Sequence, residues 1–217
     1  MAYSKLTTGN DAFAEMMNEF GIVTVMNARV YDIDEENCKF EDNSADAIRD
    51  YYKKSGNEIA FIDSLKIANV TVEGPSKTVT GGRYSNPLIK FGKSARLEMQ
   101  DALGRANVIE AFGGSVNEYT EKDGDITAMH VTEDFASEKL IIGESFFISK
   151  KSGQQVKVDI MFYRVLPDSI FNLTQDAEGD ATVFDMNADL LTAEIKMPTT
   201  VADTYIVHGV FYSILPY

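Results

Sequence analysis

The fold is decided by two apolar segments that follow one another closely, KLIIGESFFIS at residues 139–149 and QVKVDIMFYRVL at residues 155–166. The residues between them include a glycine and have the length of a hairpin loop. β-branched and aromatic residues are frequent in both segments, which favours strands. Because successive side chains of a strand point to opposite faces, the second segment has one face with Val156, Val158, Ile160 and Phe162, and another with Lys157, Asp159, Met161, Tyr163 and Val165. The pattern predicts an antiparallel β-hairpin.

Further strands are predicted on both sides of this hairpin. Strand-like runs bounded by turn residues occur at 20–33, 66–72, 93–100, 125–132, 181–192 and 204–215. In 93–100, Ala95, Leu97 and Met99 share one face. The last run is apolar on both faces, which indicates cover by a helix or by a neighbouring subunit. About eight strands separated by turn signals are typical of a β-sandwich or a barrel-like protein.

Helices have a smaller part in the predicted fold. Residues 44–54 predict a helix that Asn43 caps and Gly56 ends, and residues 101–112 predict a short packed helix. The polar stretch 34–60 interrupts two strands and is interpreted as a partly helical insertion. Residues 73–87 contain glycines and prolines and predict a long connection. The whole chain, 1–217, is therefore predicted to be a single, mainly β domain.

Charge is unevenly distributed along the 217 residues. The chain has 34 acidic and 20 basic residues, for a net charge of −14, so it is a poor general binder of nucleic acid. Residues 51–100 alone are basic, with 8 basic and 4 acidic residues. The cluster within this block consists of Lys77, Arg83, Lys90, Lys93 and Arg96. Two interpretations stay open: a solvated face, or a contact in which this basic segment meets the acidic surface of another copy.

Residue types that carry chemistry are sparse. The two histidines, His130 and His208, lie inside strand patterns, and Cys38 is the only cysteine. Asp32, Asp34 and Glu36 resemble the start of a calcium loop, but the glycine and the final glutamate that such a loop requires are missing. The chain has no Gly-Lys-Ser/Thr phosphate loop and no nucleophile elbow. We therefore expect no enzyme activity, no cofactor and no metal site.

The N-terminal residues contain no apolar signal segment, and no apolar run is long enough to span a bilayer. We expect a soluble protein that is made in a cytoplasm, with Cys38 as a reduced thiol.

Two segments carry a resemblance to a known family. Residues 86–105, NPLIKFGKSARLEMQDALGR, and residues 179–190, GDATVFDMNADL, resemble phage major tail proteins, also called tail tube proteins, and the related inner tube proteins of injection systems. In the second segment an acidic turn precedes an alternating strand, which is common late in chains of this family. The predicted order of strands, helix, hairpin and late strand fits as well.

The resemblance implies a fold, an assembly and partners. Family members form hexameric rings whose inner strands join into one β-barrel, and the rings stack into a tube through which DNA passes. The implied partners are further copies of the chain, the tape measure, baseplate and terminator proteins, a sheath if the tail contracts, and DNA in transit, with no membrane anchoring. The implied location is the tail of a virion made in the cytoplasm of a bacterial host.

Site residues follow from combining this architecture with the strand faces. The polar faces that carry Lys157, Asp159, Asp185 and Asp189 are predicted to line an acidic lumen, with an ordinary outer solvent face as the alternative. The long connection 73–87 is predicted to become ordered by contact with a neighbouring subunit. Lys77, Arg83, Lys90, Lys93 and Arg96 are predicted to lie at a contact between subunits. A different class of function also stays open: a soluble β-sandwich module that binds a receptor or a carbohydrate.

Overall fold

The fold was determined as a computed structural model, which describes residues 20–22, 26–56, 58–62, 66–74, 76–78, 88–90, 93–101, 121–122, 125–126, 137–149, 155–167, 172–174, 183–197 and 205–216. This part of the chain is mainly β, with one α-helix, α2 (Ala45–Ser55), and one 3-10 turn, η1 (Phe40–Asp42). The strands are β1 (Phe20–Ile22), β2 (Met26–Asp32), β3 (Glu58–Ile62), β4 (Lys66–Glu73), β5 (Ser76–Thr78), β6 (Leu88–Lys90), β7 (Ser94–Asp101), β8 (Glu121–Lys122), β9 (Asp125–Ile126), β10 (Lys139–Ser149), β11 (Gln155–Pro167), β12 (Asn172–Thr174), β13 (Val183–Leu191), β14 (Ala193–Met197), β15 (Tyr205–Val210) and β16 (Tyr212–Pro216). No helix in these ranges is long and apolar enough to cross a membrane.

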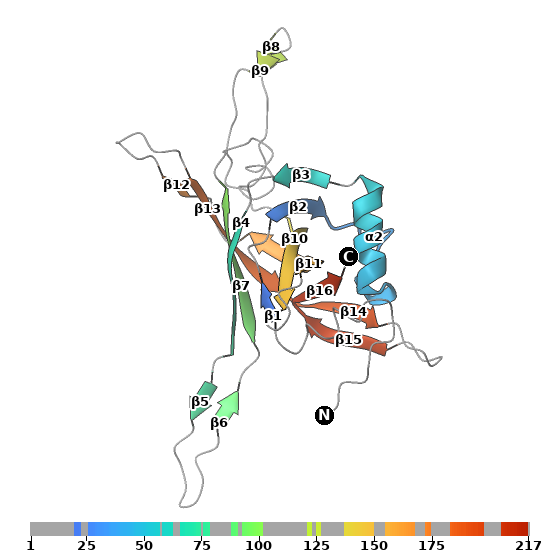
Figure 1. The fold of residues 1–217 in the computed structure, drawn as a ribbon, viewed down its shortest axis with the longest axis vertical. Helices are drawn as coiled ribbons and strands as arrows, with labels where there is room; N and C mark the ends of the chain where they lie inside the picture. The colour runs from blue at the N-terminus through green and yellow to red at the C-terminus, as the bar shows by residue number, and fades with distance from the viewer. Residues whose placement is uncertain are drawn as a thin grey trace, which may run out of the picture.

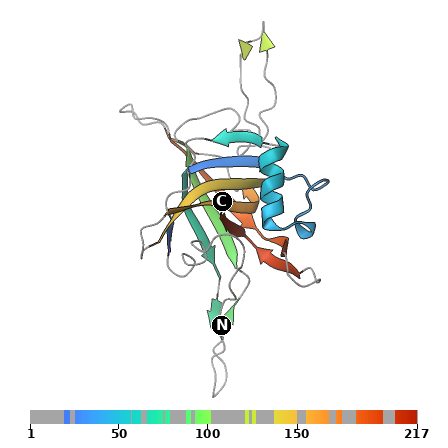
Figure 2. The same ribbon diagram turned by 45° about the vertical axis from the view of Figure 1, so that its right-hand side comes forward.

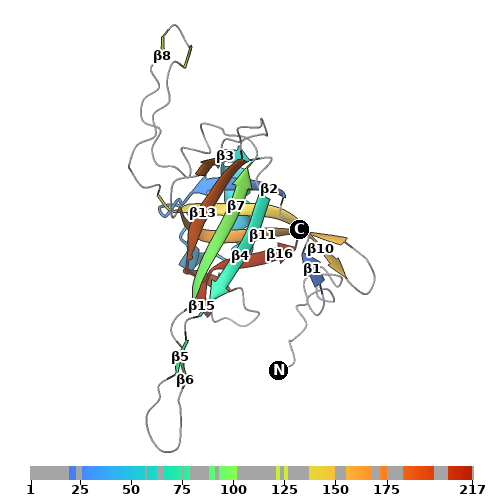
Figure 3. The same ribbon diagram turned by 90° about the vertical axis from the view of Figure 1, so that its left-hand side faces the viewer.

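Ten of the strands form one antiparallel sheet in the order β3-β2-β10-β11-β13-β7-β4, and β1, β12 and β16 pair with β10, β13 and β11. The predicted hairpin is its centre, because β10 and β11 pair over most of their length. The sheet folds back on itself, so that β13, β7 and β4 lie in front of the layer of β2, β10 and β11 and cross it (Figure 3). Three smaller two-stranded sheets, β14-β15, β5-β6 and β8-β9, complete the described topology.

An apolar core joins the two layers of the folded sheet. Leu97, Met99 and Ala188 from one layer and Val30 and Ile141 from the other are at most 1% exposed and belong to one cluster. β2, β7 and β13 each present every second residue to this cluster, as the alternation of a strand requires. The predicted apolar faces of β7 and β13 are thus confirmed at Ala95, Leu97, Met99, Met186, Ala188 and Leu190.

Helix α2 covers the other face of the β2-β10-β11 layer (Figures 1 and 2). Ile48 and Tyr52, one turn apart on the helix, are almost fully buried and pack in a second cluster with Met161 and Tyr163 of β11. The prediction that 34–60 is a partly helical segment between two strands is confirmed. The segment is not polar throughout, because Cys38, Ile48 and Tyr52 contribute to the core. The stretch looks polar in sequence because only one stripe of an amphipathic helix is apolar.

The predicted helix at 44–54 is confirmed, but its cap is a different residue. Ser44 is the N-cap, and its hydroxyl accepts a hydrogen bond from the Ala47 amide at 3.3 Å. Asn43 instead donates from its side chain to the Lys39 carbonyl oxygen at 2.7 Å. Gly56 ends the helix in the left-handed conformation, with φ of 72°, as predicted.

Most predicted strands are present, with shifted ends or breaks. The run at 204–215 is broken at Phe211 into β15 and β16, and β14 continues the run at 181–192 beyond Thr192. The sequence pattern did not predict β3, β6, β8 and β12, or β5 within the connection 73–87. A register shift in the β10-β11 pair moves Val165 to the face of Phe162, against the predicted alternation. The predicted helix at 101–112 lies outside the described residues, except for Asp101 at the end of β7.

Candidate functional site

The layer of β4, β7 and β13 has a polar outer face. Rows of residues cross the three strands in register, with Thr71, Arg96 and Asp189 in one row and Asn69, Glu98 and Asn187 in the next. Adjacent residues in a row share a face, and the opposite faces of the same strands are in the apolar core. The charged members Glu73, Arg96, Glu98 and Asp189 are all exposed. Among the described side chains of this polar sheet face, three are carboxylates and one is a cation, and Lys66 and Asp185 lie in a further row of the same face, opposite Gln100.

Of the four residues predicted to line a lumen, the structure places one on the polar sheet face. Asp189 is exposed there, beside Arg96. Asp185 lies on the same strand with its Cα opposite Gln100 of β7, and its side chain is outside the described part. Lys157 and Asp159 belong to the other layer, on the face that α2 covers.

The prediction of a water-filled surface at Asp159 is wrong, because its side chain is only 1% exposed. One carboxylate oxygen, Oδ2, lies 2.6 Å from Lys53 Nζ and 3.9 Å from Arg49 Nε, both on α2. Its other oxygen, Oδ1, is buried without a hydrogen-bond partner among the described residues. Alternation fixed the face of β11 on which Asp159 lies, but the helix that covers this face comes from a distant part of the chain.

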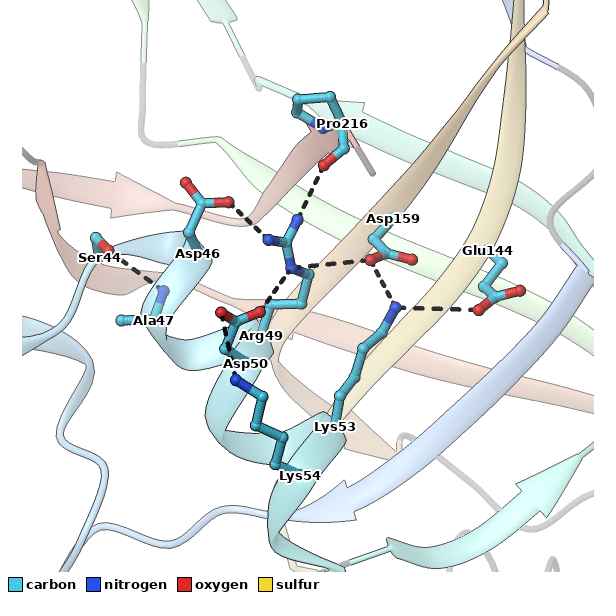
Figure 4. A network of polar contacts seen from close by, with 10 residues as sticks. All are labelled: Ser44, Asp46, Ala47, Arg49, Asp50, Lys53, Lys54, Glu144, Asp159 and Pro216. Carbon is cyan, nitrogen blue, oxygen red and sulfur yellow. Dashed lines mark hydrogen bonds and ion pairs between the residues drawn. The ribbon is translucent and has the colours of Figure 1, made fainter. Parts of the chain in front are cut away.

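The charges around Asp159 connect α2 to three strands (Figure 4). Glu144 of β10 is directly opposite Asp159 in register, and it lies 3.9 Å from Lys53 Nζ and 3.1 Å from Lys157 Nζ. Arg49 donates to the carbonyl oxygen of Pro216 in β16 at 3.0 Å. Breaking a buried pair of this kind leaves an uncompensated charge. The network therefore fixes the position of the helix on the sheet, and we assign it a structural role.

The basic cluster is divided by the structure. Lys77 in β5 and Lys90 in β6 belong to a hairpin that extends β4 and β7 beyond the body of the protein (Figure 1). Lys93 is exposed at the base of this hairpin. Arg96 lies instead on the polar sheet face, in the same row as Asp189. Arg83 lies outside the described residues.

Two further ion pairs hold the start of β10. Lys139 Nζ is 2.6 Å from Asp32 Oδ1, and Arg164 donates two parallel hydrogen bonds to the Glu138 carboxylate at 2.7 and 2.8 Å. The hydrogen bonds to Glu138 raise the pKa of Arg164. These contacts attach Lys139 of β10 to β2, and the preceding Glu138 to β11, and Asp32 binds a lysine of its own chain.

The sequence that resembles the start of a calcium loop forms the turn that follows β2. Asp34 accepts hydrogen bonds from the Tyr51 hydroxyl at 2.5 Å and from the Asn37 amide at 3.0 Å. These bonds, led by that of Tyr51, lower the pKa of Asp34. Tyr52 accepts from the Asp34 amide at 2.8 Å, and its burial raises the pKa of Tyr52 to about 12. The carboxylate of Asp34 thus binds groups of its own chain.

The cysteine and histidine side chains, which could carry out chemistry, have structural surroundings where the fold is described. Cys38 is 3% exposed, and desolvation raises the pKa of its thiol, which lowers its reactivity. His208 Nδ1 lies 2.7 Å from Glu194 Oε1 on an exposed surface, and both belong to the β14-β15 sheet. His130 is outside the described part of the chain. In that part, no three or more His, Cys, Asp or Glu residues lie together as a metal site would require.

No protein-family model matches the chain, and no curated protein matches its sequence.

Proposed function

We propose that this chain is a structural protein that polymerises, as stacked hexameric rings, into a phage tail tube with an acidic lumen that conducts DNA during ejection. The observation that carries the proposal is the polar sheet face of β4, β7 and β13, whose described charged side chains are three carboxylates and one cation. An acidic surface repels phosphate, so DNA would pass along such a face without binding to it.

The topology supports assembly into a closed wall. Among the described strands, β4 ends the sheet order and pairs on one side only, with β7. An open edge of this length offers unpaired backbone groups to another chain. If neighbouring copies pair at this edge, their polar faces join into one continuous inner surface. The tail-tube version of the fold is part of this proposal.

Electron microscopy of the purified chain tests the proposal. At high protein concentration, negative-stain images are expected to show rings or hollow tubes. The mass of the smallest ring, measured by light scattering, is expected to equal that of six chains. A monodisperse monomer at every concentration would contradict the proposal. That result would favour the other class, a soluble binding module.

A further inference from the structure

A hollow opens on the surface between the turn that follows β2 and the β14-β15 sheet. It has a volume of about 580 Å³, and its lining includes Glu35, Lys39, Glu41, Arg164 and Glu194. This volume accommodates several side chains of another chain. The lining of the hollow is thus of mixed polar character.

The charges that the hollow offers to a partner are mainly negative. Arg164 is already compensated by the two hydrogen bonds to Glu138, and Glu194 interacts with His208. Glu35 and Glu41 are exposed, and the charge of Glu35 adds to the effect of Glu138 in raising the pKa of Arg164. Among the described residues of the lining, Lys39 is the other cation. A partner that presents several cations would complement this surface.

The chain itself contains a segment of that kind. Residues 74–93, which include the β5-β6 hairpin, carry four cations and no carboxylate, although the whole chain has a net charge of −14. The hairpin extends from one end of the body, whereas η1 and β14, which contribute to the hollow, lie beside the body (Figure 1). The hairpin and the hollow are therefore different surfaces of one copy.

We propose that the basic β5-β6 hairpin of one copy docks in the acidic hollow of a second copy. A contact between two different surfaces is heterologous, and repeated head-to-tail contacts of this type build rings or filaments. The inference rests on the proposed function and deepens it, since it assigns the two surfaces of one subunit contact. The cations of the hairpin reduce the repulsion between strongly acidic copies and fix their relative position.

A charge-swap experiment tests this pairing. The variants Lys77→Glu/Lys90→Glu and Glu35→Lys/Glu41→Lys are each expected to slow tube growth, followed by light scattering, about tenfold, because each replaces two attractions at the contact by repulsions. All four changes in one chain are expected to restore growth to within about threefold of the original rate. Circular dichroism confirms that each variant is folded.

The matched control combines Lys77→Glu/Lys90→Glu with Glu73→Lys/Glu98→Lys, which reverses two exposed carboxylates of the polar sheet face. This combination is expected not to restore growth. Restoration by the control, or no restoration by the Glu35 and Glu41 reversals, would overturn the inference and leave the proposed function standing.

A second readout does not depend on tubes. In an equal mixture of ¹⁵N-labelled and unlabelled protein, carbodiimide cross-linking is expected to join a lysine of residues 74–93 to Glu35 or Glu41 in mixed-isotope pairs. Cross-links confined to pairs of one isotope, or their absence in protein that self-associates, would contradict the docking. Protein that stays monomeric would contradict the proposed function as well.

Discussion

At the scale of single residues, the environment decides what a carboxylate does. Asp159 and Asp189 are both polar positions in alternating strands, and the sequence gives no reason to separate them. Asp159 is buried under α2 and binds Lys53 at 2.6 Å, whereas Asp189 is exposed on the polar sheet face. The difference is created by α2, which is distant along the chain: Lys53 of this helix and Asp159 are separated by 106 residues.

Asp159→Asn is expected to lower the free energy of unfolding by about 3–5 kcal/mol, because it leaves Lys53 and Arg49 next to a neutral side chain in a buried site. Urea denaturation of the two proteins measures this difference. The matched control, Asp50→Asn, changes an exposed partner of the same arginine and is expected to cost at most about 1 kcal/mol. Equal losses for both variants would show that the burial of Asp159 has no energetic consequence.

The contact between Tyr51 and Asp34 predicts a specific dependence on pH. Hydrogen bonds from Tyr51 and Asn37 lower the pKa of Asp34 in the folded chain, so the charged form stabilises the fold. This contribution is fully present above the pKa of the unfolded state, about 3.9, and is lost as the pH falls through the lower folded value.

Tyr51→Phe is therefore expected to reduce the melting temperature at neutral pH, and the gap to the original protein is expected to narrow below about pH 4. Thermal melts between about pH 7 and pH 2.5 give this comparison. A gap that stays constant over the whole range would mean that Tyr51 does not act through the Asp34 carboxylate.

At the scale of elements, local patterns predicted strands better than they predicted what covers them. The β10-β11 hairpin and the buried faces of β7 and β13 follow from period-two alternation and are confirmed. The break at Phe211 was not predictable from the local pattern, because β16 pairs with the distant strand β11. The shift at Val165 is an irregularity within the β10-β11 hairpin itself, which strict alternation does not predict. Only part of the polar sheet face could be predicted from the sequence. Alternation placed Asp189 on a polar face, but which residues of β4 and β7 lie beside it depends on the register of three strands.

The β5-β6 hairpin is expected to serve assembly and not folding. Among the described strands, its two strands pair only with each other and form a sheet separate from the large one. Replacing residues 76–90 with an Asn-Gly turn is expected to leave the melting temperature nearly unchanged and to abolish tube growth, because the cations of the contact are removed. Differential scanning calorimetry and light scattering provide the two readouts. A shortened chain that still polymerises at the normal rate would contradict this assignment.

At the scale of the whole molecule, the distribution of charge predicts how salt affects assembly. A basic hairpin that docks on an acidic copy is an attraction that salt screens, over about 10 Å at 0.1 M. Growth of the original protein is therefore expected to slow as salt increases. Arg83→Glu/Lys93→Glu turns the attraction into repulsion, so this variant is expected to grow more slowly at low salt and to accelerate with added salt. Identical salt profiles for the two proteins would indicate that the basic cluster is a solvated face.

The central claim is that the polar sheet face of β4, β7 and β13 forms the inner wall of a tube. A cryo-electron microscopy reconstruction of the assembled protein tests it most directly, because it shows where each face of the subunit points. The account predicts hexameric rings in which Asp189 and Glu98 face the lumen and α2 lies in the outer part of the wall. A reconstruction with Asp189 and Glu98 on the outer surface of the assembly would contradict it.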